Sequence, residues 1–200
     1  YAFYDCDSLE KMNLSNCLVS IGNYAFYECS ALKEAIFPDS LLSIGNRTFY
    51  NCDALTIAFL GEKVSSVGSY AFFDCDALLS VNFPQSTKSL GEYAFSECEV
   101  LCDVVFEDYG LTEIKPNTFR LCPCIERVEL PKGLKIIGSQ AFMNNTVLFE
   151  IVIPESVTSI GTKAFSYPLK ATIFGTEGSY AQTWAVENRF TFVSVGVPAT

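Results

Sequence analysis

Histidine is absent from this chain of 200 residues, and its absence excludes several classes of catalytic site. Without an imidazole the chain has no Ser-His-Asp or Cys-His nucleophile system and no histidine zinc ligand. It also has no histidine to act as a general acid or base near neutral pH. Most protease, hydrolase and zinc-enzyme mechanisms are therefore excluded.

Basic residues are few as well: 13 Lys and Arg against 23 Asp and Glu give a formal net charge of −10. Binding to nucleic acid or to an anionic membrane surface depends on Lys and Arg meeting phosphate, so neither partner is expected. No apolar run approaches the length that spans a bilayer, so no membrane insertion is expected in this segment. Half of the residues are hydrophobic, which is enough for a folded domain with a sizeable core.

What the chain does contain is a repeat. A phenylalanine recurs at steps of 23 residues, with one step of 24, at Phe3, Phe26, Phe49, Phe72, Phe95, Phe119, Phe142 and Phe165. Three residues later comes a polar position, which we call the cysteine column: Cys6, Cys29, Cys52, Cys75, Cys98, Cys122 and then Asn145. An apolar residue and a glycine lie upstream of the phenylalanine, except at Ile114-Lys115 in the unit with the extra residue. A repeat of this length predicts a solenoid.

Each unit also contains a short alternating segment. Nine and eleven residues after the phenylalanine lie apolar pairs such as Val81/Phe83 and Ile151/Ile153, often followed by proline. Alternation with a period of two predicts a strand, and proline ends it because proline cannot donate to a ladder. The A-F-x-x-C stretch is expected to form a turn, or a single helical or 3₁₀ turn. One unit is therefore predicted to be one strand plus a coil of irregular chain.

The unit L-x-x-I-x-I-P-x-S-V-x-S-I-G-x-x-A-F-x-x-C, almost unaltered at residues 148–165, resembles the BspA-like class of leucine-rich repeats. The resemblance covers about residues 1–170. It implies a right-handed leucine-rich-repeat solenoid, with a parallel sheet of short strands joined by turn or 3₁₀ connections. Proteins of this class are mostly bacterial or protist surface and secreted proteins, often implicated in adhesion. The resemblance thus implies an extracellular or cell-surface location.

The expected organisation has three parts. Residues 1–170 form a repeat array of eight units, the first one partial, residues 171–195 form a C-terminal cap, and residues 196–200 start a linker. Ser179 is expected to cap a helix over 180–188 that turns Tyr180, Ala181 and Trp184 inward. Thr191 to Val195 is expected to form a closing strand. The chain starts at Tyr1 without a charged-then-apolar leader, so we expect a portion of a longer protein.

The nine cysteines allow more than one interpretation. Side chains in one column of a stacked sheet run parallel, which keeps their Cβ atoms farther apart than the ~3.8 Å of a disulfide. The column is therefore predicted to be reduced, buried and structural. Cys17, Cys102 and Cys124 fall outside it. A zinc site from Cys98, Cys102, Cys122 and Cys124, or a Cys102–Cys124 bridge, stays open as an alternative, although we expect no cofactor and no metal.

Acidic and aromatic side chains flank the column. Residues 1–100 carry 5 basic and 13 acidic side chains, net −8, and residues 101–200 carry 8 and 10, net −2. We interpret the acidic edge as a solvated surface, with calcium binding as the alternative. Tyrosines lie directly after the phenylalanine and two residues before it. They are expected to stabilise the flank, with sugar stacking or a partner contact as the alternative.

The outward face of the predicted sheet is the candidate binding site, because a solenoid sheet is an extended surface whose outward positions are not needed by the core. The candidate ligand-binding residues are Glu34, Ile36, Ile57, Phe59, Ser80 and Asn82. Their apolar centre and polar border are typical of protein interfaces. The other interpretation is that strands favour β-branched residues on either face.

The sequence favours a monomeric, non-catalytic module that binds a protein or glycan in adhesion. A glycosidase with a carboxylate pair such as Asp103 and Glu129 needs no histidine, but a shallow solenoid face differs from the concave sites of enzymes. We therefore expect no enzyme activity. The alternative function is a structural spacer or targeting array attached to another, possibly hydrolytic, domain.

Overall fold

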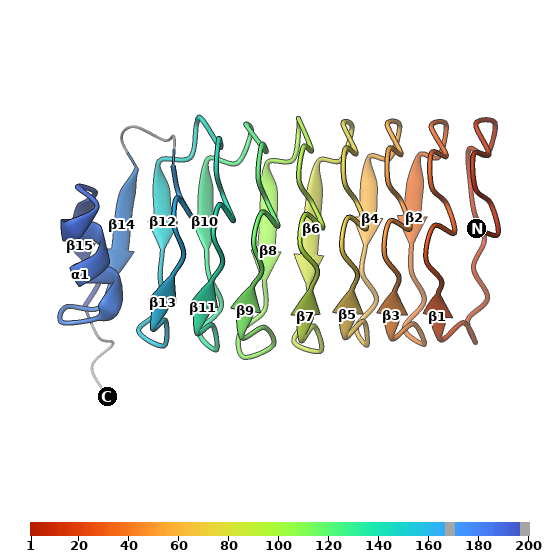
Figure 1. Cartoon of the computed structure of the whole chain (residues 1–200). Coiled ribbons are helices and arrows are strands. Elements are labelled where there is room, and N and C mark those ends of the chain that lie inside the picture. Colours follow the sequence, from red (N-terminus) through yellow and green to blue (C-terminus); the bar gives the residue numbers. More distant parts are fainter. Residues whose placement is uncertain (167–170, 197–200) are drawn as a thin grey trace.

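A computed structural model describes residues 1–166 and 171–196, which wind into a stack of rungs with the N-terminus at one end and a cap at the other (Figure 1). Each rung corresponds to one sequence repeat. Two rows of parallel strands run along the stack. Residues 167–170 of the expected array and 197–200 of the expected linker lie outside the described residues.

The predicted strands form what we call the long row. It contains β2 (Glu34–Ile36), β4 (Ile57–Phe59), β6 (Ser80–Phe83), β8 (Asp103–Phe106), β10 (Arg127–Glu129), β12 (Glu150–Val152), β14 (Thr172–Gly175) and β15 (Thr191–Ser194). From β2 to β8, neighbouring strands pair one repeat apart, so that Glu34 lies opposite Ile57 and Ile57 opposite Ser80. The partial first rung contributes only a bridge from Lys11 to Glu34. The predicted parallel solenoid is thus confirmed.

The expectation of irregular chain in the rest of each unit is wrong, because a second row of two-residue strands exists. This short row contains β1 (Ser20–Ile21), β3 (Ser43–Ile44), β5 (Ser66–Val67), β7 (Ser89–Leu90), β9 (Glu113–Ile114), β11 (Ile136–Ile137) and β13 (Ser159–Ile160). The apolar residue of each pair is buried and the polar or apolar residue before it faces outward. The glycine that follows lets adjacent rungs approach closely: a Cβ on Gly91 would lie 2.2 Å from the Ser69 nitrogen.

The A-F-x-x-C stretch forms turns, which confirms the first of the expected conformations; no 3₁₀ helix occurs in residues 1–166 or 171–196. The residues two before and two after the phenylalanine have left-handed backbone conformations, such as Tyr70 with φ 57° and Asp74 with φ 58°. The resulting turns donate to the next rung, with Phe72 N 2.8 Å from Ala94 O and Asp74 N 3.0 Å from Ser96 O. This gives the solenoid a third ladder of hydrogen bonds.

The core is a column of phenylalanine rings. Consecutive rings from Phe26 to Phe165 stack with centroids 5.0–5.6 Å apart. Phe37, directly after β2, and Phe83 of β6 pack edge-on against this column. Phe3 at the N-terminal end stacks on Phe26 but is exposed on its other side.

Both strand rows are interrupted at the same junction. Among the described residues, β8 is not hydrogen-bonded to β10, and β7 is not hydrogen-bonded to β9. We call this junction the ladder gap. It coincides with the 24-residue step and with Lys115, which stands where the other complete rungs have glycine. Because a Cβ on Gly91 or Gly138 would come within 2.5 Å of the preceding rung, a residue with a side chain holds its rung farther away.

Side chains and turns connect the rungs across the ladder gap. Asp108 Oδ2 accepts a hydrogen bond from Lys132 Nζ at 2.6 Å, and Glu97 pairs with Arg120 at 3.3 Å. The turn ladder continues, with Phe95 N 2.9 Å from Thr118 O. The core also continues, although the Phe95–Phe119 spacing of 5.6 Å is wider than the 5.0 Å of Phe72–Phe95.

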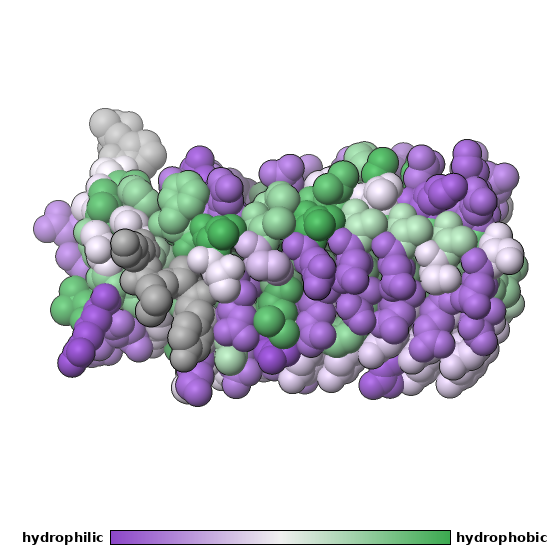
Figure 2. Space-filling view, turned by 90° about the horizontal axis from the view of Figure 1, so that it is seen from above, coloured by the Kyte–Doolittle hydropathy of each residue, from purple (hydrophilic) through white to green (hydrophobic). Residues whose placement is uncertain are grey.

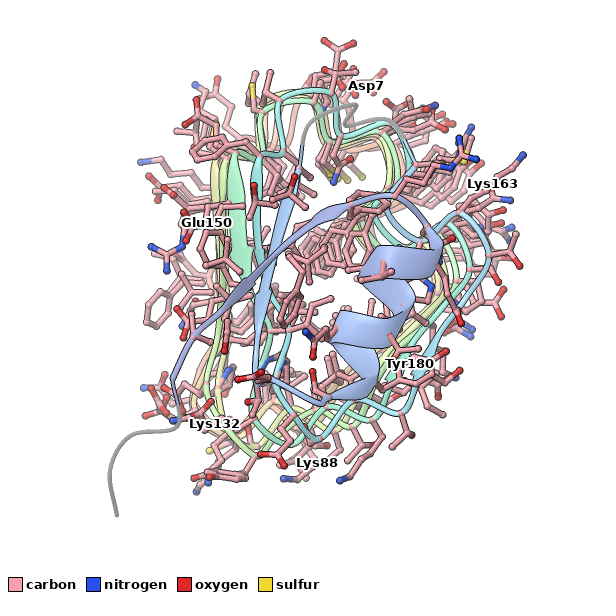
Figure 3. All side chains as sticks on the ribbon, turned by 90° about the vertical axis from the view of Figure 1, so that its left-hand side faces the viewer. Asp7, Lys88, Lys132, Glu150, Lys163 and Tyr180 are labelled. Atoms are coloured by element: carbon pink, nitrogen blue, oxygen red, sulfur yellow. The ribbon has the colours of Figure 1, made fainter. Side chains whose placement is uncertain are left out.

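The C-terminal end of the core is covered by helix α1 (Tyr180–Glu187), which Figure 3 shows lying across the end of the stack. Ser179 caps it as predicted, with its Oγ accepting from Gln182 N at 3.4 Å. Trp184 is buried and packs edge-on against Phe165 at 5.9 Å. The expectation that Tyr180 faces inward is wrong, because Ala181, Trp184 and Ala185 form the buried face. In the described ranges no helix has the length and apolarity to cross a membrane.

Candidate binding face

The six candidate residues lie close together on the outer surface of the long row. Ile36 pairs with Phe59, and Ile57 lies between Glu34 and Ser80 in the ladder. Ile36 is 61% exposed, Ile57 43% and Phe59 51%. Glu34 and Ser80 are exposed, whereas Asn82 is half-buried. Figure 3 shows the outward direction of this row at Glu150, which points away from the interior.

A hollow of about 430 Å³ adjoins the candidate residues at the N-terminal side of the sheet. Glu34 and Ile36 form one wall, and Lys11 and Asn13 of the partial first rung form another. The face therefore combines a flat apolar area at Ile57 and Phe59 with a recess beside Ile36. This relief gives a partner both a surface to cover and a place to insert a side chain.

A second hollow, of about 450 Å³, lies at the ladder gap and contains Asp103 and Glu129. Arg127 stands beside them, with its Nη2 3.5 Å from Glu129 Oε2 and its Nε 2.8 Å from Glu150 Oε1. The carboxylate pair considered for a glycosidase thus lies on an open face, with one member already paired to arginine. Such a site does not exclude water in the way that catalysis at a glycosidic bond requires.

The prediction for the cysteine column is confirmed for its five members from Cys29 to Cys122, which are buried and unbridged; Cys6 at the N-terminal end is half-buried. Each buried thiol donates to the carbonyl oxygen of a phenylalanine in the preceding rung, as Cys52 does to Phe26 at 3.2 Å. Burial raises the pKa of the Cys52 thiol. Asn145 serves the same loop differently, since its Oδ1 accepts from Cys122 N at 2.9 Å.

The acidic edge is partly desolvated. Burial and then the neighbouring Asp76 carboxylate raise the pKa of Asp53 and of Asp74. Within the described residues, no group of three or more Cys, Asp or Glu side chains is placed to hold a metal ion. The zinc alternative also conflicts with the geometry, because the Cys98 and Cys122 thiols point to phenylalanine carbonyls and not to a common centre.

The tyrosine rows stack on one another along the flank. Tyr4, Tyr27 and Tyr50 lie 4.9–5.0 Å apart with nearly parallel rings. Arg47 occupies the gap in the other row, with its guanidinium 4.9 Å from the Tyr70 ring centroid. Because the ring faces are covered by neighbouring rings, they are not open for sugar stacking within the rows. Burial raises the pKa of Tyr27 to about 12.

Sequence reasoning missed exposed apolar residues just before the strands. Leu79 precedes β6, and Phe149 and Val147 precede β12; all three are exposed. Figure 2 shows apolar residues in a line between hydrophilic ones on the edge of the array seen from above. The sequence position that could have revealed them is the one directly before each long-row strand, which holds Thr56, Leu79, Cys102, Glu126 and Phe149.

A family model, the BspA type leucine rich repeat region, matches residues 1–109 and 44–172 in six copies. The chain belongs to the BspA-type leucine-rich repeat family. The consensus-like segment 148–165 shows how the BspA-type repeat uses its residues, since Ile151, Ile153, Val157 and Ile160 are all buried. The outward-facing side chains between them are not part of the buried core.

Solved structures of leucine-rich repeat proteins share the fold. One from Bacteroides ovatus is 25% identical with a TM-score of 0.60, over 82% of this chain and 50% of that one. A leucine rich cell surface protein from Faecalibacterium prausnitzii is 24% identical with a TM-score of 0.62, over 92% and 64%. A leucine-rich repeat protein of T. pallidum is 21% identical with a TM-score of 0.52, over 89% and 81%.

The BspA-type array described here therefore spans half of the Bacteroides ovatus protein and 64% of the Faecalibacterium prausnitzii protein. No curated protein sequence matches the chain.

Proposed function

We propose that this chain is a non-catalytic, extracellular or cell-surface binding module whose long-row face holds a protein or glycan ligand in adhesion. The observation that carries the proposal is the apolar group Ile36, Ile57 and Phe59 at the centre of an exposed sheet. Large apolar side chains in solvent are costly to keep exposed unless they are covered part of the time. The similarity to the leucine rich cell surface protein of Faecalibacterium prausnitzii supports the location.

Two further features favour a protein ligand with basic groups. The apolar centre is bordered by Glu34, Ser80 and Asn82, and a polar border around an apolar centre is how protein interfaces are built. The half of the chain that contains this face has a net charge of −8, which attracts a basic partner over distance. Raising the salt concentration is therefore expected to slow association more than it speeds dissociation.

The test is the variant Phe59→Ala, with Phe149→Ala as matched control. Phe59 and Phe149 are 51% and 52% exposed, but only Phe59 lies within the candidate face. A binding screen of extracellular matrix proteins and glycans supplies the ligand. Phe59→Ala is expected to weaken binding by at least about 2 kcal/mol, because large central side chains dominate interface energy. Phe149→Ala is expected to leave the affinity unchanged, and both variants to keep the melting temperature.

Two outcomes contradict the proposed site. Weaker binding of Phe149→Ala with normal binding of Phe59→Ala would move the contact to the edge of the array. A large stability loss of Phe59→Ala would show that this ring supports the fold. If neither the matrix proteins nor the glycans bind, the array is better described as a spacer or targeting segment for another domain.

A further inference from the structure

Two cysteines outside the column lie on the two rungs that border the ladder gap. Cys102 lies directly before β8, and Cys124 lies three residues before β10. Cys102 is exposed and Cys124 is half-buried, whereas the five column thiols from Cys29 to Cys122 are buried. These two sulfur atoms are therefore accessible to reagents in solution in a way that the column is not.

The stacking of the rungs places the two cysteines on neighbouring turns. The Cys102 Sγ folds back over its own turn and lies 3.2 Å from the Val100 carbonyl oxygen. Val100 occupies the position that Cys124 takes one rung later, because the step there is 24 residues. The Cys102 sulfur thus lies beside the residue on which Cys124 stacks in the next rung, within reach of a bond between the two rungs.

The column pair at the same junction differs in its bonding. Cys98 Sγ lies 3.2 Å from the Phe72 carbonyl oxygen, and Cys122 Sγ lies 3.1 Å from that of Phe95. Each of these thiols has an acceptor of its own in the preceding rung and is shielded from solvent. Oxidation at the junction is therefore expected to be selective for Cys102 and Cys124.

We propose that Cys102 and Cys124 form a disulfide under oxidising conditions and that this bond ties the two rungs between which both strand ladders are open. A disulfide reagent such as oxidised glutathione is the oxidant. One protein thiolate attacks a glutathione sulfur and releases one glutathione thiolate; the second protein thiolate attacks the mixed disulfide and releases the other. Two protein thiols lose two protons and two electrons, one Sγ–Sγ bond forms, and the oxidant's S–S bond is reduced to two thiols.

The position of the bond gives it a mechanical effect. Asp108–Lys132 and Glu97–Arg120 are the ion pairs among the described residues that span the ladder gap, and partly exposed ion pairs hold two elements together only weakly. A covalent tie there limits how far the rungs separate. It also fixes the width of the hollow that Cys102 lines together with Asp103 and Arg127.

The experiment oxidises the full chain with glutathione disulfide, blocks the remaining thiols and maps the fragments without reduction. Cleavage after Glu99 and after Arg120 separates Cys98 from Cys102 and divides the two sides of the bridge. A fragment with Cys102 joined to the fragment that carries Cys122 and Cys124 is expected. The melting temperature is expected to rise by about 3–8 °C on oxidation.

Three variants assign the bond. Cys102→Ser and Cys124→Ser are expected to lose both the cross-link and the rise in melting temperature, and Cys17→Ser, an exposed cysteine elsewhere, to keep both. Glutathione adducts on Cys102 and Cys124 without a cross-link would overturn the proposal. So would a cross-link that persists in Cys124→Ser, because Cys122 would then be the partner, or an unchanged melting temperature after complete cross-linking.

Discussion

The thiol of each buried column cysteine is both a small apolar group and a hydrogen-bond donor. In all five buried members the sulfur lies 3.0–3.2 Å from a phenylalanine carbonyl oxygen of the preceding rung. The thiol fills space in the turn and satisfies a main-chain group that the turn geometry leaves without a ladder partner. The column thus links each rung to the rung before it through a side chain.

This role predicts an order of stabilities at Cys52. Cys52→Ala is expected to lower the free energy of unfolding by about 2 kcal/mol, because it removes the buried sulfur and leaves the Phe26 carbonyl oxygen with only the 3.3 Å hydrogen bond from Cys29 N. Cys52→Ser is expected to cost only about 1 kcal/mol, since its hydroxyl can donate to the same oxygen. Denaturant unfolding measures both, with Cys17→Ala as an exposed control within about 0.5 kcal/mol. A serine variant less stable than the alanine variant would contradict the hydrogen-bonding role.

For individual residues, the sequence predicted the role of positions that recur in every repeat better than the orientation of side chains that occur once. The burial of the cysteine column was predicted because cysteine recurs at one position of the repeat. The cap at Ser179 was predicted because serine directly before a helix is a local signal. The inward orientation of Tyr180 was predicted wrongly. Its direction depends on how α1 sits on the last rung, and helical spacing alone does not distinguish the 181/184/185 face from one that includes Tyr180.

Among the elements, the short row illustrates what periodicity cannot reveal. Its strands have two residues each, which is too short for alternation to be visible. The information was in the glycine column, which marks a close approach of backbones. The structure shows the approach directly: a Cβ on Gly68, Gly91 or Gly161 would lie 2.2–2.5 Å from atoms of the preceding rung.

The glycines therefore predict a position-dependent cost. Gly91→Ala is expected to lower the free energy of unfolding by about 2–4 kcal/mol, because β7 would have to move away from β5. Gly22→Ala is the matched control, because nothing lies within 4 Å of its Cβ position. It is expected to be neutral or to stabilise by about 0.4–1 kcal/mol through the unfolded chain. Equal losses in the two variants would refute the argument from close approach.

For the molecule as a whole, the extra residue in the fifth step of the repeat was visible in the sequence, but its consequence was not. The loss of both strand ladders coincides with that residue and with Lys115, and only the stacked rungs show the two rows opening together. The candidate face shows a similar division. Alternation predicted which side chains point outward, but the hollow beside Ile36 depends on where the partial first rung lies.

The ladder gap predicts that the solenoid contains two cooperative units. Stability in a solenoid is a sum of local terms and of interfaces between neighbours, so damage spreads only as far as the interfaces are strong. Phe72 is fully buried and stacks 5.1 Å from Phe49 and 5.0 Å from Phe95. Phe72→Ala is expected to cost about 3–5 kcal/mol, as for other buried aromatic truncations.

Native-state hydrogen exchange identifies the rungs in which stability is lost. In Phe72→Ala, protection is expected to fall in β2 to β8 and to be largely retained in β10 to β15, because few backbone bonds transmit the damage across the ladder gap. Phe142→Ala, in the equivalent column position beyond the gap, is expected to give the reverse pattern. Uniform loss of protection in either variant would show that the continuous phenylalanine column and the turn ladder suffice to unite the rungs.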